Sequence, residues 1–288
     1  MTRGITFQGG ALNLAGRMLK TGMTAPDFKV VAQDLKEVRL ADFAGKIKVI
    51  TSFPSIDTKV CDLQVKEFNK IAAGLSSDVL ILGISKDLPF AQQRFCEAFE
   101  IRNIKVLSDY KTGSFGINFG LLIRELNLLA RSIIILDKNN IIRYIQIVKE
   151  LSSSPDYQEA LSRLQVVIRD PALTVNEQIP THCKPCEGVV SPLSAQERGR
   201  MFSQLKEWQL IEDKKIAKEF KFKDFIEAKY FLDLISVIAE EQGHHPGLNL
   251  VYNKLKITLA THAAGGLTEN DFIMAGIIDE LAVDAASA

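Results

Sequence analysis

Residues 47–75 read IKVITSFPSIDTKVCDLQVKEFNKIAAGL, and this stretch decides the fold of the first part of the chain. Its apolar start is typical of a buried strand, and apolar side chains recur every three or four residues from Val65 to Leu75, as on one face of a helix. Cys61 therefore lies near the first turn of that helix, where free amide hydrogens favour a thiolate. The alternative is a free cysteine buried as a small hydrophobe, and Cys61 alone does not decide between the two.

The alternation of strand and helix continues on both sides of this stretch. The sequence predicts a hairpin around Gly9-Gly10, a strand at 78–85 and a helix at 89–99. Residues 131–148 read as two strands joined through 137–140, and residues 155–165 as a closing helix with Pro155 in its first turn. Continuous apolar strands with helices between them predict an α/β domain whose central sheet is covered on both faces.

The composition is that of a globular protein with room for two domains. The chain has 288 residues, of which 47% are hydrophobic and 24% charged, and its 35 Lys+Arg balance 35 Asp+Glu. This balance gives no indication of nucleic-acid binding. The sequence shows neither a signal-peptide start nor a membrane-spanning run, so we expect a cytoplasmic protein without membrane contact. Four cysteines are too few for a disulfide scaffold, so each needs its own explanation.

The pattern changes at residues 170–194, which hold four prolines and no periodicity. We therefore predict a first domain at 1–168, a linker at 169–182 and a second domain at 183–288. In the second part, capping boxes at Ser194–Glu197 and Asp224–Glu227 mark two helices. A strand at 216–222, two strands that meet near Asn253-Lys254 and a last helix at 268–282 complete it. This order predicts a smaller α+β domain, with an antiparallel sheet and helices on one face.

Five segments of the first part carry a family resemblance: PSIDTKVCDLQ at 54–64, ITFQGGALNLAG at 5–16, APDFKVVAQDL at 25–35, DLPFAQQRFCEAF at 87–99 and ARSIIILD at 130–137. Together they resemble the thiol peroxidases, atypical two-cysteine peroxiredoxins, over residues 3–165. The resemblance implies a thioredoxin-like fold and the reduction of hydroperoxides, with thioredoxin as external reductant and no bound cofactor.

The resemblance also implies roles for single residues. Cys61 stands at the peroxidatic position and Cys96 at the resolving position, so an intramolecular disulfide is expected. Because both cysteines lie in or at predicted helices, forming this bond requires local unwinding. Thr58 and Pro54 match the active-site loop, and Arg131 matches the arginine that would stabilise the thiolate and polarise the peroxide. Without the resemblance, Cys96 reads as a core cysteine and Arg131 as a solvated charge at a strand edge. The stretch 120–130 looks shorter than the usual loop of the family, which leaves the preferred peroxide open.

Three of the four histidines fall in one region: residues 240–246 read EEQGHHP, and His262 follows a predicted strand. A histidine at a strand end is most often an ordinary surface or core residue. Imidazoles with Glu240 could also bind zinc, but the spacing matches no common zinc signature. Proton transfer is the third interpretation, because histidine titrates near neutral pH.

The order and spacing of seven residues in this region resemble the signature of the pterin-4a-carbinolamine dehydratases: Glu240, His244, His245, Pro246, Tyr252, His262 and Asp271. The similarity covers about residues 183–284. It implies dehydration of 4a-hydroxytetrahydropterin to quinonoid dihydropterin, without metal or organic cofactor. His245 and His262 would transfer protons, His244 would contact the pterin, and Glu240, Pro246 and Asp271 would help to bind it.

At two positions the sequence differs from this family, and both differences count against the same activity in this domain. Leu248 stands where many members have an aromatic residue, and Asn270 where an arginine is frequent. Asp271 can also be a helix cap together with Thr268.

Cys183 and Cys186 form a C-x-x-C pair. This pair can be a structural or metal-prone feature, or it can be a dithiol that relays electrons to the first domain. The sequence thus predicts a bifunctional enzyme that self-associates as a homo-oligomer and takes peroxide and pterin substrates. The alternatives are a second domain that has lost catalysis and serves dimerisation or partner binding, or one that binds metal.

Overall fold

The computed structural model describes residues 4–169, 183 and 191–285. Contacts along the chain divide it into two compact units, from Thr2 to Ile179 and from Pro180 to Ala288. The predicted linker lies outside the described residues from position 170 on, so the predicted boundaries stay a prediction. In the described part of the chain, no helix is both long and apolar enough to cross a bilayer.

A seven-stranded mixed sheet forms the centre of the first domain, in the order β11-β10-β5-β6-β7-β3-β4. The strand β5 is buried along its whole length and pairs in parallel with β6, as β6 does with β7. The other pairings are antiparallel. The strands are β3 (Lys29–Val31), β4 (Glu37–Arg39), β5 (Ile47–Ser52), β6 (Val79–Ser85), β7 (Lys105–Ser108), β10 (Ser132–Leu136) and β11 (Ile142–Ile147).

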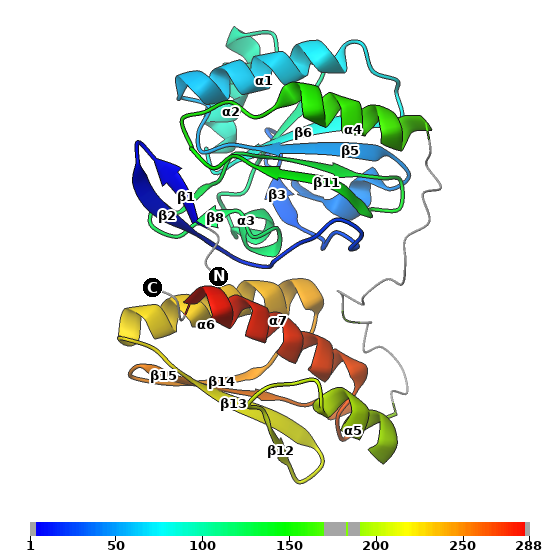
Figure 1. Ribbon diagram of the computed structural model, residues 1–288, viewed down its shortest axis with the longest axis vertical. Coiled ribbons are helices and arrows are strands. Elements are labelled where there is room, and N and C mark those ends of the chain that lie inside the picture. Colours follow the sequence, from blue (N-terminus) through cyan, green and yellow to red (C-terminus); the bar gives the residue numbers. More distant parts are fainter. Residues whose placement is uncertain (1–3, 170–182, 184–190, 286–288) are drawn as a thin grey trace. The chain divides into compact units, whose positions relative to one another are not determined.

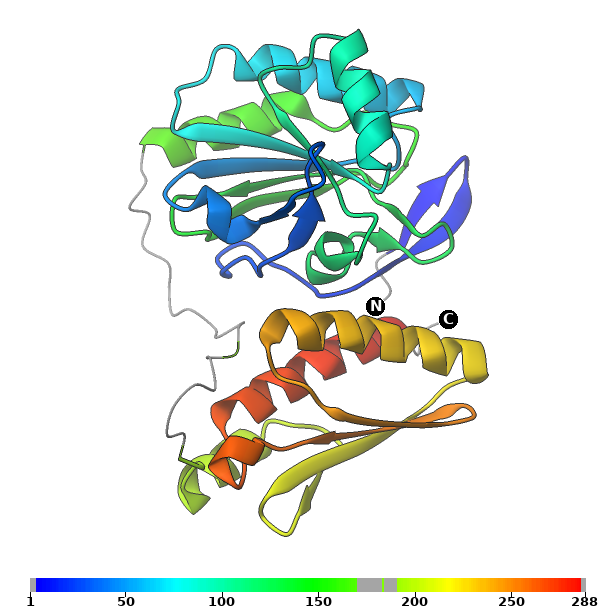
Figure 2. The ribbon, with the colours of Figure 1, turned by 180° about the vertical axis from the view of Figure 1, so that it is seen from behind.

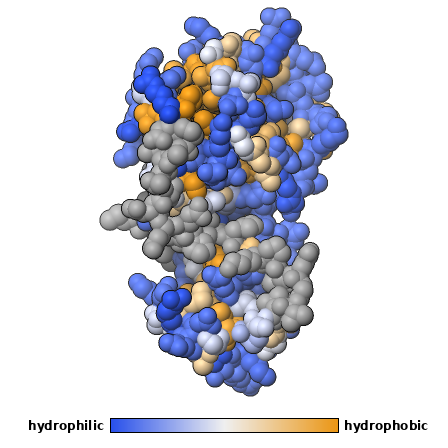
Figure 3. Space-filling view, turned by 90° about the vertical axis from the view of Figure 1, so that its right-hand side faces the viewer, coloured by the Kyte–Doolittle hydropathy of each residue, from blue (hydrophilic) through white to orange (hydrophobic). Residues whose placement is uncertain are grey.

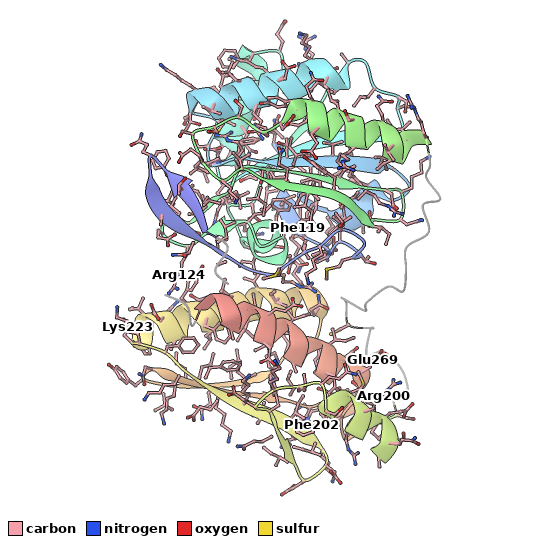
Figure 4. The ribbon with its side chains drawn as sticks, viewed as in Figure 1. Phe119, Arg124, Arg200, Phe202, Lys223 and Glu269 are labelled. Carbon is pink, nitrogen blue, oxygen red and sulfur yellow. The ribbon has the colours of Figure 1, made fainter. Side chains whose placement is uncertain are left out.

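Both faces of this sheet are covered, as the apolar strands predict. Three helices pack on one face: α1 (Lys59–Ala72), α2 (Pro89–Ala98) and α4 (Tyr157–Arg169) (Figure 1). The other face is covered by η1 (Leu40–Phe43), by α3 (Ser114–Asn118) and by a second sheet in the order β1-β2-β8-β9. Phe119, labelled in Figure 4, follows α3 directly and packs edge to face on Phe28 in this second core.

The hairpin predicted near the start is β1 (Gly4–Phe7) and β2 (Gly10–Ala15), which stands at one side of the domain in Figures 1 and 2. Its turn is Gln8-Gly9, one residue earlier than predicted, because both residues have positive φ, as a tight hairpin turn requires. The stretch 120–130 forms a second hairpin, β8 (Leu122–Ile123) with β9 (Leu128–Leu129). The placement of Pro155 in the first turn of α4 was wrong, since that helix begins at Tyr157.

The second domain is a four-stranded antiparallel sheet in the order β12-β13-β15-β14. Its strands are β12 (Gln209–Ile211), β13 (Lys215–Lys221), β14 (Gly247–Val251) and β15 (Lys254–Leu259). The long helices α6 (Phe225–Gln242) and α7 (Glu269–Ala285) lie side by side on one face of this sheet, as predicted (Figures 1 and 2). Alternate residues of β15, namely Leu255, Ile257 and Leu259, are fully buried in the core, as is Ile216 of β13.

The helix ends follow local signals. The helix α5 (Ala195–Phe202) begins with the predicted capping box of Ser194 and Glu197. At the start of α6, the Asp224 side chain accepts a hydrogen bond from the Glu227 amide at 2.9 Å. Gly243 ends α6 in the left-handed conformation (φ 60°) and redirects the chain toward the histidines. On the face seen in Figure 3, hydrophilic side chains predominate in both domains and hydrophobic ones form smaller patches.

Candidate active sites

The first candidate site lies where the chain passes from β5 into α1. Cys61 is in the first turn of α1 and is fully buried. Thr58, the residue at the helix N-cap, donates its hydroxyl to the Cys61 sulfur at 2.8 Å. The buried Pro54 begins the loop between strand and helix. The sequence therefore predicted correctly that Cys61 lies near the first turn of this helix.

A carboxylate that the sequence analysis missed holds this loop. Asp87, two residues after β6, accepts hydrogen bonds from the Ser55 hydroxyl at 2.7 Å and from the Ile56 amide at 2.9 Å. Because Asp87 and Ser55 are 32 residues apart in sequence, the pairing depends on the parallel strands β5 and β6, which bring their carboxyl ends together.

Arg131 makes a second hydrogen bond to the Cys61 sulfur. This arginine directly precedes β10 and is 1% exposed, so it is no surface charge at a strand edge. Its Nη2 donates to the Cys61 sulfur at 3.4 Å and to the Leu151 carbonyl at 3.0 Å. Its Nη1 donates to Gln64 Oε1, and Gln64 in turn donates to Thr51 Oγ1 at 2.5 Å. Gln64, a second residue that the sequence did not reveal, fixes the guanidinium from the face of α1 that Cys61 shares.

Cys96 lies in the last turn of α2, is 8% exposed and belongs to the same core cluster as Cys61. Both are free thiols. The Gln33 amide nitrogen donates to the Cys96 sulfur at 3.2 Å. Burial raises the pKa of the Cys96 thiol; the Gln33 hydrogen bond lowers it and the nearby Glu97 charge raises it further.

In the second domain, the histidines divide into one buried residue and two exposed ones. His244 is 6% exposed and its Nε2 lies 2.8 Å from Asp271 Oδ1. The other oxygen of Asp271 accepts hydrogen bonds from the Thr268 amide and the Thr261 hydroxyl, both at 2.8 Å. Asp271 thus caps the start of α7, where Glu269 is labelled in Figure 4, and also orients His244.

His245 and His262 line one cavity of about 220 Å³, together with Lys215, Gly247, Thr258 and Ala260. His245 Nε2 lies 3.2 Å from Glu240 Oε2, and both side chains are about two-thirds exposed. His262 comes from the short helix η2 (His262–Ala264) after β15. These two histidines, which are close in the sequence pattern, thus meet in one cavity, but the sequence analysis missed Lys215 at the start of β13.

The remaining predicted residues lie around this cavity or away from it. Pro246 and Leu248 are half-buried, in the turn before β14 and in β14. Asn270 is 5% exposed, and its carbonyl accepts a hydrogen bond from the Cys183 thiol at 3.7 Å. The Cys183 amide donates to Gln242 at 2.8 Å, while Cys186 lies outside the described residues. Within residues 4–169, 183 and 191–285, no three His, Cys, Asp or Glu side chains are grouped as for a metal ion.

Comparison with known proteins gives two separate similarities. The Redoxin family model matches residues 20–161, and the Pterin 4 alpha carbinolamine dehydratase model matches residues 191–281. The thiol peroxidase of Bacillus subtilis (strain 168) is 45% identical over 165 residues, which are 57% of this chain and 98% of that protein.

Two solved structures are each similar to a part of the chain. A peroxiredoxin-like protein from Aquifex aeolicus is 37% identical with a TM-score of 0.55, over 58% of this chain and 98% of its own. A structure described as a transcriptional coactivator/pterin dehydratase from Brucella melitensis is 35% identical over 32% of this chain and 99% of its own, with a TM-score of 0.31. The match to the Redoxin model covers the site around Cys61 and Cys96, and the match to the dehydratase model covers His244, His245 and His262.

Proposed function

Since the chain belongs to the thiol peroxidase family through its N-terminal, thioredoxin-like domain and carries a pterin-4a-carbinolamine dehydratase domain after it, we propose that it is a bifunctional enzyme. The first activity reduces hydroperoxides at Cys61, with Cys96 as resolving cysteine and thioredoxin as reductant. The second removes water from 4a-hydroxytetrahydropterin at the cavity of His245 and His262.

The burial of Arg131 is the observation that best supports the peroxidase. A guanidinium at 1% exposure needs an anionic or strongly accepting environment, because a buried charge without one costs several kcal/mol. The partners that the structure shows are a glutamine, a backbone carbonyl and the Cys61 sulfur. A Cys61 thiolate would balance this charge, which supports the ionised sulfur as the reacting group.

The proposed reaction then proceeds in two steps. The Cys61 thiolate attacks one peroxide oxygen and the O–O bond breaks. The attacked oxygen stays on sulfur with its proton, so that Cys61 becomes a sulfenic acid, and the alkoxide or hydroxide that leaves takes a proton from solvent to become alcohol or water. The Arg131 guanidinium and the Thr58 hydroxyl are placed to stabilise the negative charge that passes from sulfur to oxygen. Cys96 next displaces water from the sulfenic acid to form a disulfide, and a thioredoxin dithiol reduces this disulfide.

The test of the peroxidase is hydroperoxide consumption by the full chain with thioredoxin and its reductase. Cys61→Ser should abolish turnover. Cys96→Ser should keep the first oxidation of Cys61 but lose thioredoxin-driven turnover, and intact mass should show one added oxygen on Cys61. Turnover that persists in Cys61→Ser would contradict the proposal.

The cavity in the second domain supports proton transfer by two imidazoles. His245 and His262 line one space of about 220 Å³ from two different segments, and Glu240 can orient His245. One imidazole would protonate the departing 4a-hydroxyl while the other removes the N5 proton. The buried His244–Asp271 pair supports the turn that carries His245, and this pairing argues against the direct pterin contact predicted for His244.

Lys215 places a positive charge in the lining of this cavity. Asn270, at the position where the family often has an arginine, is buried and does not line the cavity. We therefore assign the steering of an electron-rich pterin to Lys215.

The test of the dehydratase follows the dehydration of 4a-hydroxytetrahydropterin by the intact protein. We expect acceleration that disappears in the His245→Ala, His262→Ala variant. Lys215→Met should raise KM with little change in kcat. No acceleration by the wild-type protein would instead support a second domain that serves dimerisation or partner binding.

The cytoplasmic location and the homo-oligomer predicted from the sequence also remain proposals. Light scattering of the purified full chain tests the oligomer directly.

A further inference from the structure

We propose that Gln33 is a positioning residue that holds the Cys96 sulfur away from Cys61 and so limits the rate of disulfide formation. This inference rests on the proposed peroxidase function. It assigns a role to a side chain of the β3–β4 turn, which lies outside the cysteine loop and outside both helices that carry the two thiols.

The two sulfurs lie on the same face of the central sheet, but the residues that anchor them are next to strands that are far apart in it. The Cys61 sulfur is bound by Arg131, which directly precedes β10, and the Cys96 sulfur by Gln33, two residues after β3. Three strands, β5, β6 and β7, lie between β10 and β3. At about 4.8 Å between neighbouring strands, these backbone anchors are roughly 19 Å apart.

Both thiols are free in this structure, and a disulfide requires the sulfurs to approach to about 2.05 Å, so the Cys96 sulfur has to leave the position in which Gln33 holds it. The hydrogen bond therefore exists in the reduced ground state but is absent from the transition state of disulfide formation. An interaction of this kind slows the step that breaks it.

The surroundings of Gln33 allow it to release the sulfur without disturbing the core. Gln33 is half-buried and lines a cavity of about 470 Å³, which is bounded on other sides by Phe43, Ile101 and Ile104. Its side chain has space to swing into. Gln33 and Cys96 are 63 residues apart in sequence, so the hydrogen bond ties the end of α2 to a separate part of the fold.

The test uses Gln33→Met, which keeps the length of the side chain and removes the donor. Rapid mixing of reduced full-length protein with hydroperoxide, followed by alkylation and intact mass, should show disulfide formation about two- to five-fold faster than in the wild type. The fraction of Cys61 oxidised further to sulfinic acid should fall by a similar factor, because the sulfenic acid lives for a shorter time. The first oxidation of Cys61, measured in a Cys96→Ser background, should not change. Unchanged or slower disulfide formation would overturn the inference.

A second measurement does not depend on peroxide chemistry. In reduced protein with Cys61→Ser, the alkylation rate of Cys96 is followed by peptide mass and divided by the thiolate fraction read from its pH dependence, because loss of the Gln33 hydrogen bond also raises the pKa of this thiol. The corrected rate should rise about two- to five-fold when Gln33→Met is added. Gln93→Met is the matched control, because Gln93 is exposed on the same helix as Cys96 and donates to Glu97 instead. If wild-type protein formed no disulfide with peroxide, the proposed function would fail. If the disulfide forms but Gln33→Met changes neither the rate of disulfide formation nor the alkylation rate of Cys96, only the role of Gln33 fails.

Discussion

At the scale of single residues, the first site depends on one buried arginine whose position is fixed twice. Gln64 holds Arg131 from α1, and the Leu151 carbonyl holds it from the segment after β11. Glu150 stabilises that segment by accepting hydrogen bonds from Thr6 and Ser152, which lower the pKa of its carboxyl to about 2. The Arg131 side chain is therefore held in the conformation in which its guanidinium contacts the Cys61 sulfur.

We predict that Arg131→Lys lowers kcat/KM for hydroperoxide by about 10- to 100-fold. An ammonium cannot reproduce the planar fork that contacts Gln64, Leu151 and the sulfur together, and each lost charged hydrogen bond is worth about 1.5–3 kcal/mol. Initial rates of peroxide consumption check the prediction. Arg94→Lys, an exposed change on α2, is the control and should keep wild-type activity. A value within two-fold of the wild type for Arg131→Lys would argue against a direct role.

Lys48 in β5 gives a prediction about stability and pH. Its side chain is fully buried, and its Nζ donates to Asn140 Oδ1 at 2.5 Å. Burial lowers the pKa of Lys48 to about 8, although the Asp137 charge acts in the opposite direction. Because the unfolded lysine titrates near 10.5, the unfolded chain holds the extra proton between pH 8 and 10.5. The folded state is therefore penalised at neutral pH, and the penalty disappears as the pH rises through this window.

Lys48→Met should raise the free energy of unfolding of the first domain by on the order of 1–3 kcal/mol at pH 7. The advantage over the wild type should shrink between pH 8 and pH 10.5. Hydrogen exchange of peptides from β5 in urea reports this domain separately. An advantage that stays constant across the pH range would show that lost charge is not its cause.

At the scale of elements, α1 and α2 are joined by a cation–π contact at the end of α2, and we expect this contact to limit how easily that end opens. The Lys66 ammonium lies 3.4 Å from the centroid of the Phe99 ring, at the C-cap of α2 and three residues beyond Cys96. The Phe99 ring also packs against Phe95 at 4.9 Å. These contacts involve the last turn of α2, which would have to unwind in the proposed disulfide formation between Cys96 and Cys61.

Lys66→Met should therefore increase the opening of this turn. A cation–π contact at a partly exposed site is worth about 0.5–1 kcal/mol, so the amides of Phe99 and Ile101 should exchange about two- to five-fold faster. Hydrogen exchange of peptides covering residues 95–103 measures the effect. Lys70→Met, on the exposed side of α1, is the control. Equal exchange in both variants would mean that Lys66 does not hold α2.

The elements that the sequence predicted are those with strong local signals. The strands β6 and β10 are mostly apolar, β5 is buried along its whole length, and the capping box of Ser194 and Glu197 lies within four residues. The short strands β3, β4, β7 and β12 were missed, because three or four residues carry little periodicity and pairing with distant segments stabilises them.

The same division applies to the sites. The Thr58–Cys61 contact follows from the start of one helix. The contacts of Gln64 with Arg131 and of Gln33 with Cys96 join segments 67 and 63 residues apart, and only the folded chain brings them together. Lys215 was missed for the same reason, since it reaches the histidine cavity only through the pairing of β13 with β15.

At the scale of the whole molecule, each domain contains its own core and a complete set of the residues proposed for its reaction. The cysteines, Thr58 and Arg131 all lie in the first domain, and the histidines, Asp271 and Lys215 all lie in the second. An electron relay from Cys183 and Cys186 to the first domain would connect the two. Cys183 argues against such a relay, because its thiol is 4% exposed and donates to the Asn270 carbonyl.

We therefore predict that the two activities are independent in the full chain. Cys61→Ser should abolish peroxide reduction and leave pterin dehydration unchanged, and His245→Ala with His262→Ala should do the reverse. Cys183→Ser with Cys186→Ser should leave thioredoxin-driven peroxide turnover within two-fold of the wild type, since a buried thiol cannot exchange with a disulfide without prior opening. Steady-state assays of both reactions on the same protein preparations decide the matter. A large loss of peroxide turnover in the Cys183, Cys186 variant would establish the relay and make the second domain part of the peroxidase cycle.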